Sequence, residues 1–207
     1  MQAYLDDEPL TSTTVASAIE AARDAAGARG RIVIEVLADG SPIDGALLDE
    51  PPTTDAGIAE LRMTSAELGS FVSVTLADAA DALRASTEAR LHAADAMDQG
   101  RFDAAGDSLA KLLGVWAMAR DVLDKSGQLI GVDPSTLTLA DPEGGSISGA
   151  ACIDGLVRVL GEVKSAVGDE DWSQVSDLLH DELDEQARQW ELLLRLLAET
   201  ARESPSA

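Results

Sequence analysis

Residues 101–126 read RFDAAGDSLAKLLGVWAMARDVLDKS, and this stretch decides the fold. Its apolar side chains recur at intervals that alternate between three and four residues, at Phe102, Ala105, Leu109, Leu112, Trp116, Ala119 and Leu123. Such a heptad seam is typical of helices that pack side by side along their length. The sequence therefore predicts a helix here that buries one stripe against neighbouring helices.

The stretch before it, residues 66–99, predicts a second long helix. It contains no proline, it is rich in alanine, and Gly100 marks its end. Thr64 and Glu67 have the spacing of a capping box at its start. Residues 71–76 read FVSVTL and could also form a strand, because β-branched residues favour strands. Capping and continuity favour the helix.

Two further helices are predicted after a linker at residues 127–148, which is rich in glycine and proline. The first of them carries a stripe at Ile153, Leu156, Leu160, Val163 and Val167, and the second at Leu179, Leu183, Trp190, Leu193 and Leu197. We therefore expect hairpins 65–126 and 149–202 to bury their stripes against each other. The result is an antiparallel four-helix bundle over residues 65–203.

Residues 1–64 carry most of the strand and turn signals of the chain, and they predict a small α+β module. The run 31–37 reads RIVIEVL and predicts a strand that ends in the tight turn Asp39-Gly40. A helix with an apolar stripe is expected over residues 13–26, with its N-cap in the run 11–14 and its end at Gly27. Short strands are expected at residues 3–5, 41–43 and 58–63, a turn at 6–9 and a loop at 44–56. The predicted fold class is α+β, mostly helical.

The two helical hairpins also resemble each other at an offset of 70 residues. Phe102 aligns with Trp172, and the turns at residues 98–101 and 168–171 coincide. A duplication and a chance match between amphipathic hairpins are both open.

The composition narrows the partners that the chain can bind. It has 15 Lys and Arg against 38 Asp and Glu, a formal charge of −23. We expect no nucleic acid and no membrane partner, because phosphates and anionic lipids attract clustered basic residues. No secretory signal is visible and Cys152 is the only cysteine, which indicates the cytoplasm. Arginine outnumbers lysine by 12 to 3, which favours a GC-rich bacterial genome.

No residue pattern in the sequence is specific enough to indicate a reaction or a ligand, so we expect no catalytic residue, no metal and no cofactor. Asp177 and His180 share a helix face, but a carboxylate-bridged di-iron bundle needs two such pairs. Cys152 is interpreted as a small buried hydrophobe. The glycine-rich stretch 143–149 lacks the lysine of a phosphate loop and is interpreted as a linker with a serine cap. The acidic runs 6–8 and 169–171 are interpreted as solvated turns.

The unusual features are apolar. Residues 190–197 read WELLLRLL, which covers more than one stripe and predicts burial on two sides. The second side could be the N-terminal module, a second copy of the chain, or a target. The residues predicted to bind a partner are Trp116, Trp190, Leu192, Leu194 and Leu196, because tryptophan is enriched at binding hot spots.

These features favour a non-enzymatic acidic interaction protein, an adaptor or an assembly or export chaperone that binds a protein through apolar helix faces. In general build the helical half resembles small acidic bacterial helical chaperones and adaptors, including those of flagellar export, although no motif assigns a family. Two alternatives are a metal-binding or enzymatic bundle that uses Asp177 and His180, and a structural homo-oligomer, for which a homodimer is plausible.

Overall fold

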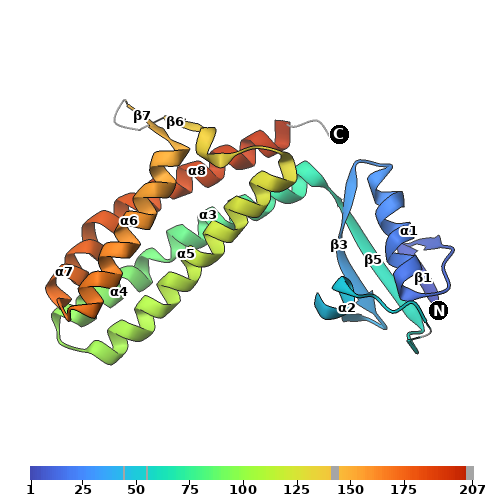
Figure 1. Ribbon diagram of the computed structural model, residues 1–207, viewed down its shortest axis with the longest axis horizontal. Helices are drawn as coiled ribbons and strands as arrows, with labels where there is room; N and C mark the ends of the chain where they lie inside the picture. The colour runs from blue at the N-terminus through green and yellow to red at the C-terminus, as the bar shows by residue number, and fades with distance from the viewer. Residues whose placement is uncertain (44, 55, 141–144, 204–207) are drawn as a thin grey trace. The chain divides into compact units, whose positions relative to one another are not determined.

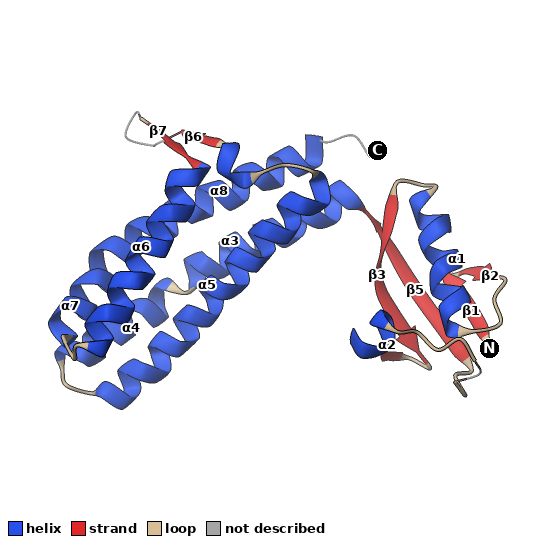
Figure 2. Ribbon diagram, in the orientation of Figure 1, coloured by secondary structure: helices blue, strands red, loops and turns tan. Residues whose placement is uncertain are grey.

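The structure is a computed structural model, and it describes residues 1–43, 45–54, 56–140 and 145–203. The described chain divides into two compact units, an N-terminal unit of residues 1–71 and a helical unit of residues 72–203. The first holds a small mixed sheet and the second is built of helices (Figure 1, Figure 2). The predicted α+β, mostly helical class is confirmed.

The N-terminal unit contains a five-stranded sheet in the order β2-β1-β5-β3-β4. Its strands are β1 (Gln2–Leu5), β2 (Glu8–Leu10), β3 (Arg31–Ala38), β4 (Ser41–Pro42) and β5 (Glu60–Glu67). β1 and β5 are parallel, and the other neighbours are antiparallel. β5, the last of these five strands in the sequence, therefore lies in the middle of the sheet, between the two hairpins that precede it.

Helix α1 (Val15–Gly27) covers one face of this sheet, as Figure 2 shows. Thr14 is its N-cap and exchanges hydrogen bonds with Ser17 in a capping box. The buried side of α1 packs with buried residues of the strands in one cluster, formed by Ala3, Leu5, Val15, Ala18, Ile19, Ala22, Ala26, Leu61 and Met63. The predicted helix, its cap and its end at Gly27 are confirmed.

Aspartates hold the two hairpin turns of the sheet. Asp6 and Asp7 have φ of 49° and 65°, and Asp39 and Gly40 have φ of 48° and 80°, the signature of type I′ turns. The Asp6 carboxylate accepts hydrogen bonds from the Ser65 hydroxyl (2.5 Å) and backbone N–H (2.8 Å). These bonds lower the pKa of Asp6. The Asp39 carboxylate accepts from the first N–H of β5 at 2.8 Å, so both turns are tied to the central strand.

Three details of the N-terminal prediction were wrong. Residues 8–10 form the edge strand β2 instead of continuing a turn, and the proline within it is tolerated because its outer side has no ladder partner. The predicted loop at 44–56 contains a short helix, α2 (Gly45–Asp49). Thr64 lies inside β5, where side chains alternate between the two faces, so it does not cap a helix.

The helical unit consists of four antiparallel rods (Figure 1). The first is α3 (Leu68–Ala85) followed by α4 (Thr87–Asp98), the second is α5 (Phe102–Ile130), and the third is α6 (Gly149–Gly168). The fourth is α7 (Trp172–Asp177), a π-helical turn (Leu178–Glu182) and α8 (Leu183–Glu203). α4 packs against α5 and α7, and α6 packs against α7 and α8. The predicted pair of hairpins is confirmed, and residues 71–76 are helical.

Two of the rods are less regular than predicted. The first is interrupted at Ser86, whose hydroxyl donates to the Leu83 carbonyl at 2.7 Å and competes with the helical ladder. The predicted linker begins later than residue 127, because α5 continues to Ile130. Within the linker a single turn of 3₁₀-helix (Pro134–Thr136) precedes the small hairpin of β6 (Thr138–Ala140) and β7 (Ser146–Ser148). Residues 141–144 lie outside the described residues.

The two hairpin turns have the same backbone geometry at the predicted offset. The Gly100 N–H donates to the carbonyl of Met97 (2.9 Å), and 70 residues later the Glu170 N–H donates to that of Val167 (3.2 Å). Gly100 and Glu170 also share a positive φ, 69° and 56°. The aromatic rings that follow the turns, Phe102 and Trp172, contact each other with centroids 4.8 Å apart. A duplication and a chance match between amphipathic hairpins both stay open.

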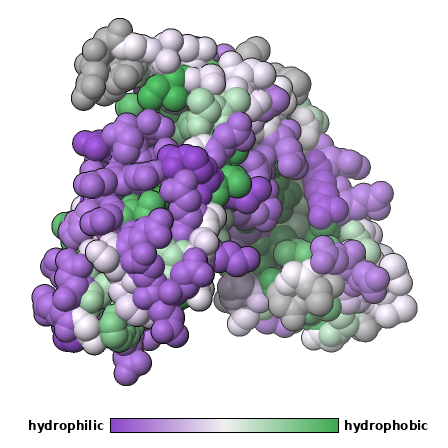
Figure 3. All heavy atoms as spheres, turned by 60° about the vertical axis from the view of Figure 1, so that its left-hand side comes forward, coloured by the Kyte–Doolittle hydropathy of each residue, from purple (hydrophilic) through white to green (hydrophobic). Residues whose placement is uncertain are grey.

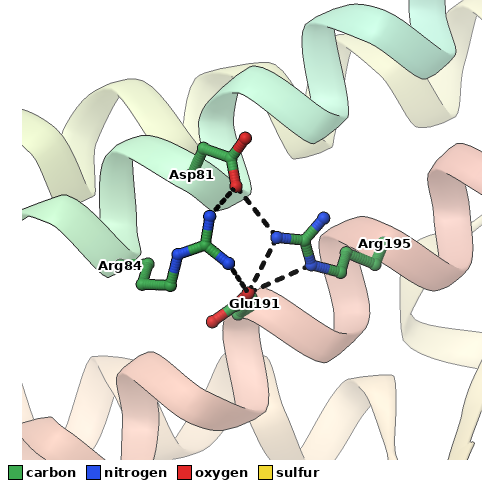
Figure 4. Close-up of polar contacts among 4 residues, drawn as sticks. All are labelled: Asp81, Arg84, Glu191 and Arg195. Atoms are coloured by element: carbon green, nitrogen blue, oxygen red, sulfur yellow. Dashed lines mark hydrogen bonds and ion pairs between the residues drawn. The ribbon is translucent and has the colours of Figure 1, made fainter.

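An ion-pair network joins α3 to α8 on the outside of the helical unit. Figure 4 shows Arg195 of α8 reaching both Asp81 of α3 (2.9 Å) and Glu191 of its own helix (2.9 Å). Arg84 pairs with Asp81 at 2.6 Å and approaches Glu191 at 3.5 Å. Hydrogen bonds to the two carboxylates raise the pKa of Arg195. The side chains are partly exposed, so each pair contributes about 0–1 kcal/mol, and the network mainly fixes the register of the two helices.

Replacing Gly149 by alanine is expected to destabilise the helical unit by about 1–3 kcal/mol. A Cβ at Gly149, the first residue of α6, would lie 2.0 Å from the Pro134 carbonyl oxygen, and this oxygen is backbone. The matched control is Gly161→Ala in the same helix, where a Cβ meets nothing within 4 Å and alanine should stabilise the helix by about 0.5–1 kcal/mol. Urea unfolding followed by tryptophan fluorescence checks both. Equal changes in the two variants would contradict the close approach of the linker.

Candidate partner-binding groove

An open groove with a volume of about 410 Å³ lies between α5 and α6. We call it the α5–α6 groove. Its lining consists of Leu113, Trp116, Ala117, Arg120, Asp121, Asp124, Ile153, Leu156, Val157, Leu160 and Trp190. It exists because α5 packs mainly along α4 whereas α6 packs along α7 and α8, so the facing sides of α5 and α6 are left apart.

Two tryptophans form the floor of the groove. Trp116 comes from α5 and Trp190 from α8, and their rings meet edge to face with centroids 5.7 Å apart. The Trp190 indole N–H donates to the Cys152 carbonyl of α6 at 3.2 Å. Only 3% of Trp116 and 1% of Trp190 is exposed. The floor is therefore held by three helices and is fixed before any partner arrives.

The α6 wall of the groove is a second apolar stripe, which lies beside the stripe that forms the core. On α6 the core stripe contains Leu156 and Val159, while Ile153, Val157 and Leu160 form a stripe beside it. Val157 is 57% exposed, and Leu113 on the α5 wall is 40% exposed. These positions are apolar, accessible and at helical spacing, a combination that the core does not explain.

Charged residues line the α5 rim of the groove. Asp121 pairs with Lys125 at 2.8 Å, and Asp124 only approaches Arg120, at 3.9 Å. All four side chains are more than half exposed, so these pairs are weak. The lining of the groove therefore contains two carboxylates, Asp121 and Asp124, against one cation, Arg120.

The structure brings together two of the five residues predicted to bind a partner. Trp116 and Trp190 lie in the floor of the groove, as described above. Leu194 is fully buried, and Leu192 and Leu196 are half-buried. Since a helix turns by about 100° per residue, these last two lie on the opposite side of α8 from Trp190. Their role in binding stays a prediction, and the groove does not include them.

Leu113 and Val157, two exposed large apolar residues of the walls, were not among the residues predicted to bind a partner. A signal for them was present. Val157 follows Ile153 by four residues and precedes Leu160 by three, which places a second apolar stripe on a helix that already has one. Ile153 and Leu160 were predicted to lie in the buried seam of the helix, so this second stripe was not recognised.

Cys152 is buried in α6 beneath the groove. Burial raises the pKa of its thiol to about 12. The thiol is therefore protonated at neutral pH, and the thiolate, which is the reactive form, is not available. The interpretation of Cys152 as a small buried hydrophobe is confirmed.

The two histidines and Asp177 lie in different helical segments. His92 Nδ1 lies 2.9 Å from the Ser108 hydroxyl, which links α4 to α5. Asp177 ends α7 and His180 lies in the π-helical turn. Among the described residues, no group of three or more His, Cys, Asp and Glu could hold a metal ion. Ser148 caps α6 as predicted, accepting from the N–H of Ala151.

The acidic runs pair with arginines or cap helices. Asp7 pairs with Arg62 at 2.7 Å, Glu8 pairs with Arg29 at 2.5 Å, and Asp171 accepts from a backbone N–H at the start of α7.

No helix in the described part of the chain combines the length and the hydropathy needed to cross a membrane. Hydrophilic side chains cover most of the face in Figure 3, with smaller hydrophobic patches between them. Comparisons with protein-family models, curated proteins and solved structures give no match.

Proposed function

We propose that this protein is a non-enzymatic adaptor or assembly chaperone that binds a protein partner through the α5–α6 groove. The observation that supports the proposal is the pairing of a rigid tryptophan floor with exposed apolar walls at Leu113 and Val157. Pockets of this kind, with buried aromatic anchors and an accessible apolar surround, carry most of the binding energy at protein interfaces.

The charge of the chain suits such a role. Residues 72–203 carry 25 acidic and 11 basic side chains, a formal charge of −14. A net charge of this size keeps a protein with an open apolar groove soluble, and it accelerates encounter with partners of opposite charge. An adaptor or chaperone needs both properties, because it must remain dispersed until its partner arrives.

Site-specific photocrosslinking tests the proposal. We expect p-benzoylphenylalanine in place of Val157 to capture a discrete protein in native lysate, because that position lies on the wall of the groove and is 57% exposed. The matched control places the same group at Val74 of α3, which is 56% exposed and outside the groove. The substitution Leu113→Asp on the opposite wall should abolish the adduct at position 157.

Two outcomes would overturn the proposed function. One is the absence of any adduct at position 157. The other is an adduct of equal yield at positions 157 and 74 that persists with Leu113→Asp. Such labelling would reflect nonspecific association with the surface instead of binding in the groove.

A further inference from the structure

We infer that the occupant of the α5–α6 groove is an amphipathic helix of another protein, with an apolar stripe flanked by lysine or arginine. This inference rests on the proposed function, because it identifies the partner of the same site. It follows from the length of the groove, the backbone chemistry of its walls and the charge of its rim.

The dimensions of the groove suit one short helix. Its α5 wall extends from Leu113 to Asp124, which is about three helical turns. The α6 wall presents Ile153, Val157 and Leu160, spaced four and three residues apart. A helix with side chains at i, i+3, i+4 and i+7 packs against walls of this spacing as a third ridge, in the helix-in-groove mode.

The walls do not suit an extended segment. Both walls are formed by the middle parts of long helices, α5 and α6. The backbone N–H and C=O groups there are already hydrogen-bonded within each helix. An extended peptide laid in the groove would lose hydrogen bonds to water and gain none from the walls. A helix brings its backbone groups already paired, so only its side chains have to fit.

The charge of the rim selects a basic occupant. Asp121 and Asp124 stand on the α5 wall, against one cation among the lining residues, Arg120. Arg158 of α6, which follows Val157 in the sequence, is held by Glu162 (2.9 Å) and Glu182 (2.7 Å). A second copy of this chain would bring its own charge of −23 to the same rim, so repulsion disfavours self-association here.

Three synthetic peptides of about 18 residues test the inference, a length that supports an amphipathic helix. The first has a leucine stripe flanked by lysine, the second has the same stripe flanked by glutamate, and the third is a scramble of the first. Binding to the full chain is followed by the fluorescence of Trp116 and Trp190, in a Trp172→Phe background that removes the third tryptophan. We expect the lysine peptide to bind at least tenfold more tightly than the other two.

Two sets of variants locate the binding. Val157→Ser should weaken the lysine peptide at least tenfold, while Val74→Ser should leave it unchanged. Neutralising the rim with Asp121→Asn and Asp124→Asn should weaken it at least fivefold. The control neutralises Asp78 and Asp98 instead, which changes the total charge equally but leaves the rim intact, and should change affinity less than twofold.

The outcomes separate this inference from the proposed function. Equal binding of the lysine and glutamate peptides would overturn the basic occupant. A photocrosslinked protein at position 157 with no response to either striped peptide would overturn the helical occupant, while protein binding at the groove would stand. Light scattering that shows a dimer whose formation requires Val157 would overturn the inference in favour of a second copy.

Discussion

Replacing Arg90 by methionine is expected to lower the free energy of unfolding of the helical unit by about 3 kcal/mol. The Arg90 side chain is 6% exposed and bridges α4 to the fourth rod. Its guanidinium donates to the carbonyl of Leu179 (2.5 Å) and to that of His180 (3.0 Å), and pairs with Asp184 at 2.5 Å. Methionine fills a similar volume but leaves the buried Leu179 carbonyl without this donor.

The π-helical turn explains why an arginine is buried at this point. In this turn the Leu183 N–H donates to the Leu178 carbonyl, five residues earlier, so the ladder is wider than in an α-helix. The carbonyls of Leu179 and His180 lie within this turn and accept from Arg90 of a different rod. The irregular turn and the buried cation therefore stabilise each other.

Arg188→Met is the matched control, because Arg188 pairs with the same carboxylate, Asp184, at 3.3 Å. Its side chain is 66% exposed, and we expect its loss to change stability by less than about 0.5 kcal/mol. All three tryptophans lie in the helical unit, so urea unfolding followed by their fluorescence reports this unit alone. Equal losses in the two variants would show that Arg90 acts only as a surface ion pair.

The parts of the fold that could be predicted from the sequence are those in which the information is local. The run 31–37 is β-branched and ends at a turn dipeptide, so β3 follows from neighbouring residues alone. The stripe of α1 and the seam of α5 are likewise repeats of three and four residues within one segment. Two hairpins with such seams have few ways to bury them other than a bundle.

The features that could not be predicted depend on residues far apart in the chain. Arg90 lies in an alanine-rich helix with no local sign of burial, and its backbone acceptors are about 90 residues away. The strand β2 forms because β1 offers it a ladder, which overrides the weak strand propensity of Glu8 and Pro9. Thr64 has the spacing of a capping box, but its pairing with Glu35 on the neighbouring strand places it in the sheet.

The candidate site likewise has features that could be predicted from the sequence and features that could not. Trp116 and Trp190 were recognisable from the sequence as unusual apolar anchors in a chain with 3% aromatic residues. Their contact with each other was not, because it depends on how α8 packs beneath the space between α5 and α6. The groove itself results from α5 packing mainly along α4 while α6 packs along α7 and α8, and no pattern within α5 or α6 alone specifies that.

Replacing Trp190 by alanine is expected to destabilise the helical unit by about 3–5 kcal/mol, which is the range for removing a fully buried large aromatic side chain. Trp190 is 1% exposed, packs edge to face on Trp116, and donates to the Cys152 carbonyl. Its removal leaves a cavity under the groove that neighbours on three helices cannot fill together. Urea unfolding followed by circular dichroism measures the loss.

Two controls separate the contributions of Trp190. Trp190→Phe keeps a ring against Trp116 but removes the N–H donor, and should cost less than half as much as Trp190→Ala because much of the packing remains. Trp172→Ala removes a half-buried ring whose partner Phe102 is 46% exposed, and should cost about 1 kcal/mol. If Trp190→Ala unfolds at the same urea concentration as the wild type, the floor of the groove is not part of the core. The rigidity on which partner binding relies would then be absent, because an anchor that contributes nothing to folding cannot hold the walls in place.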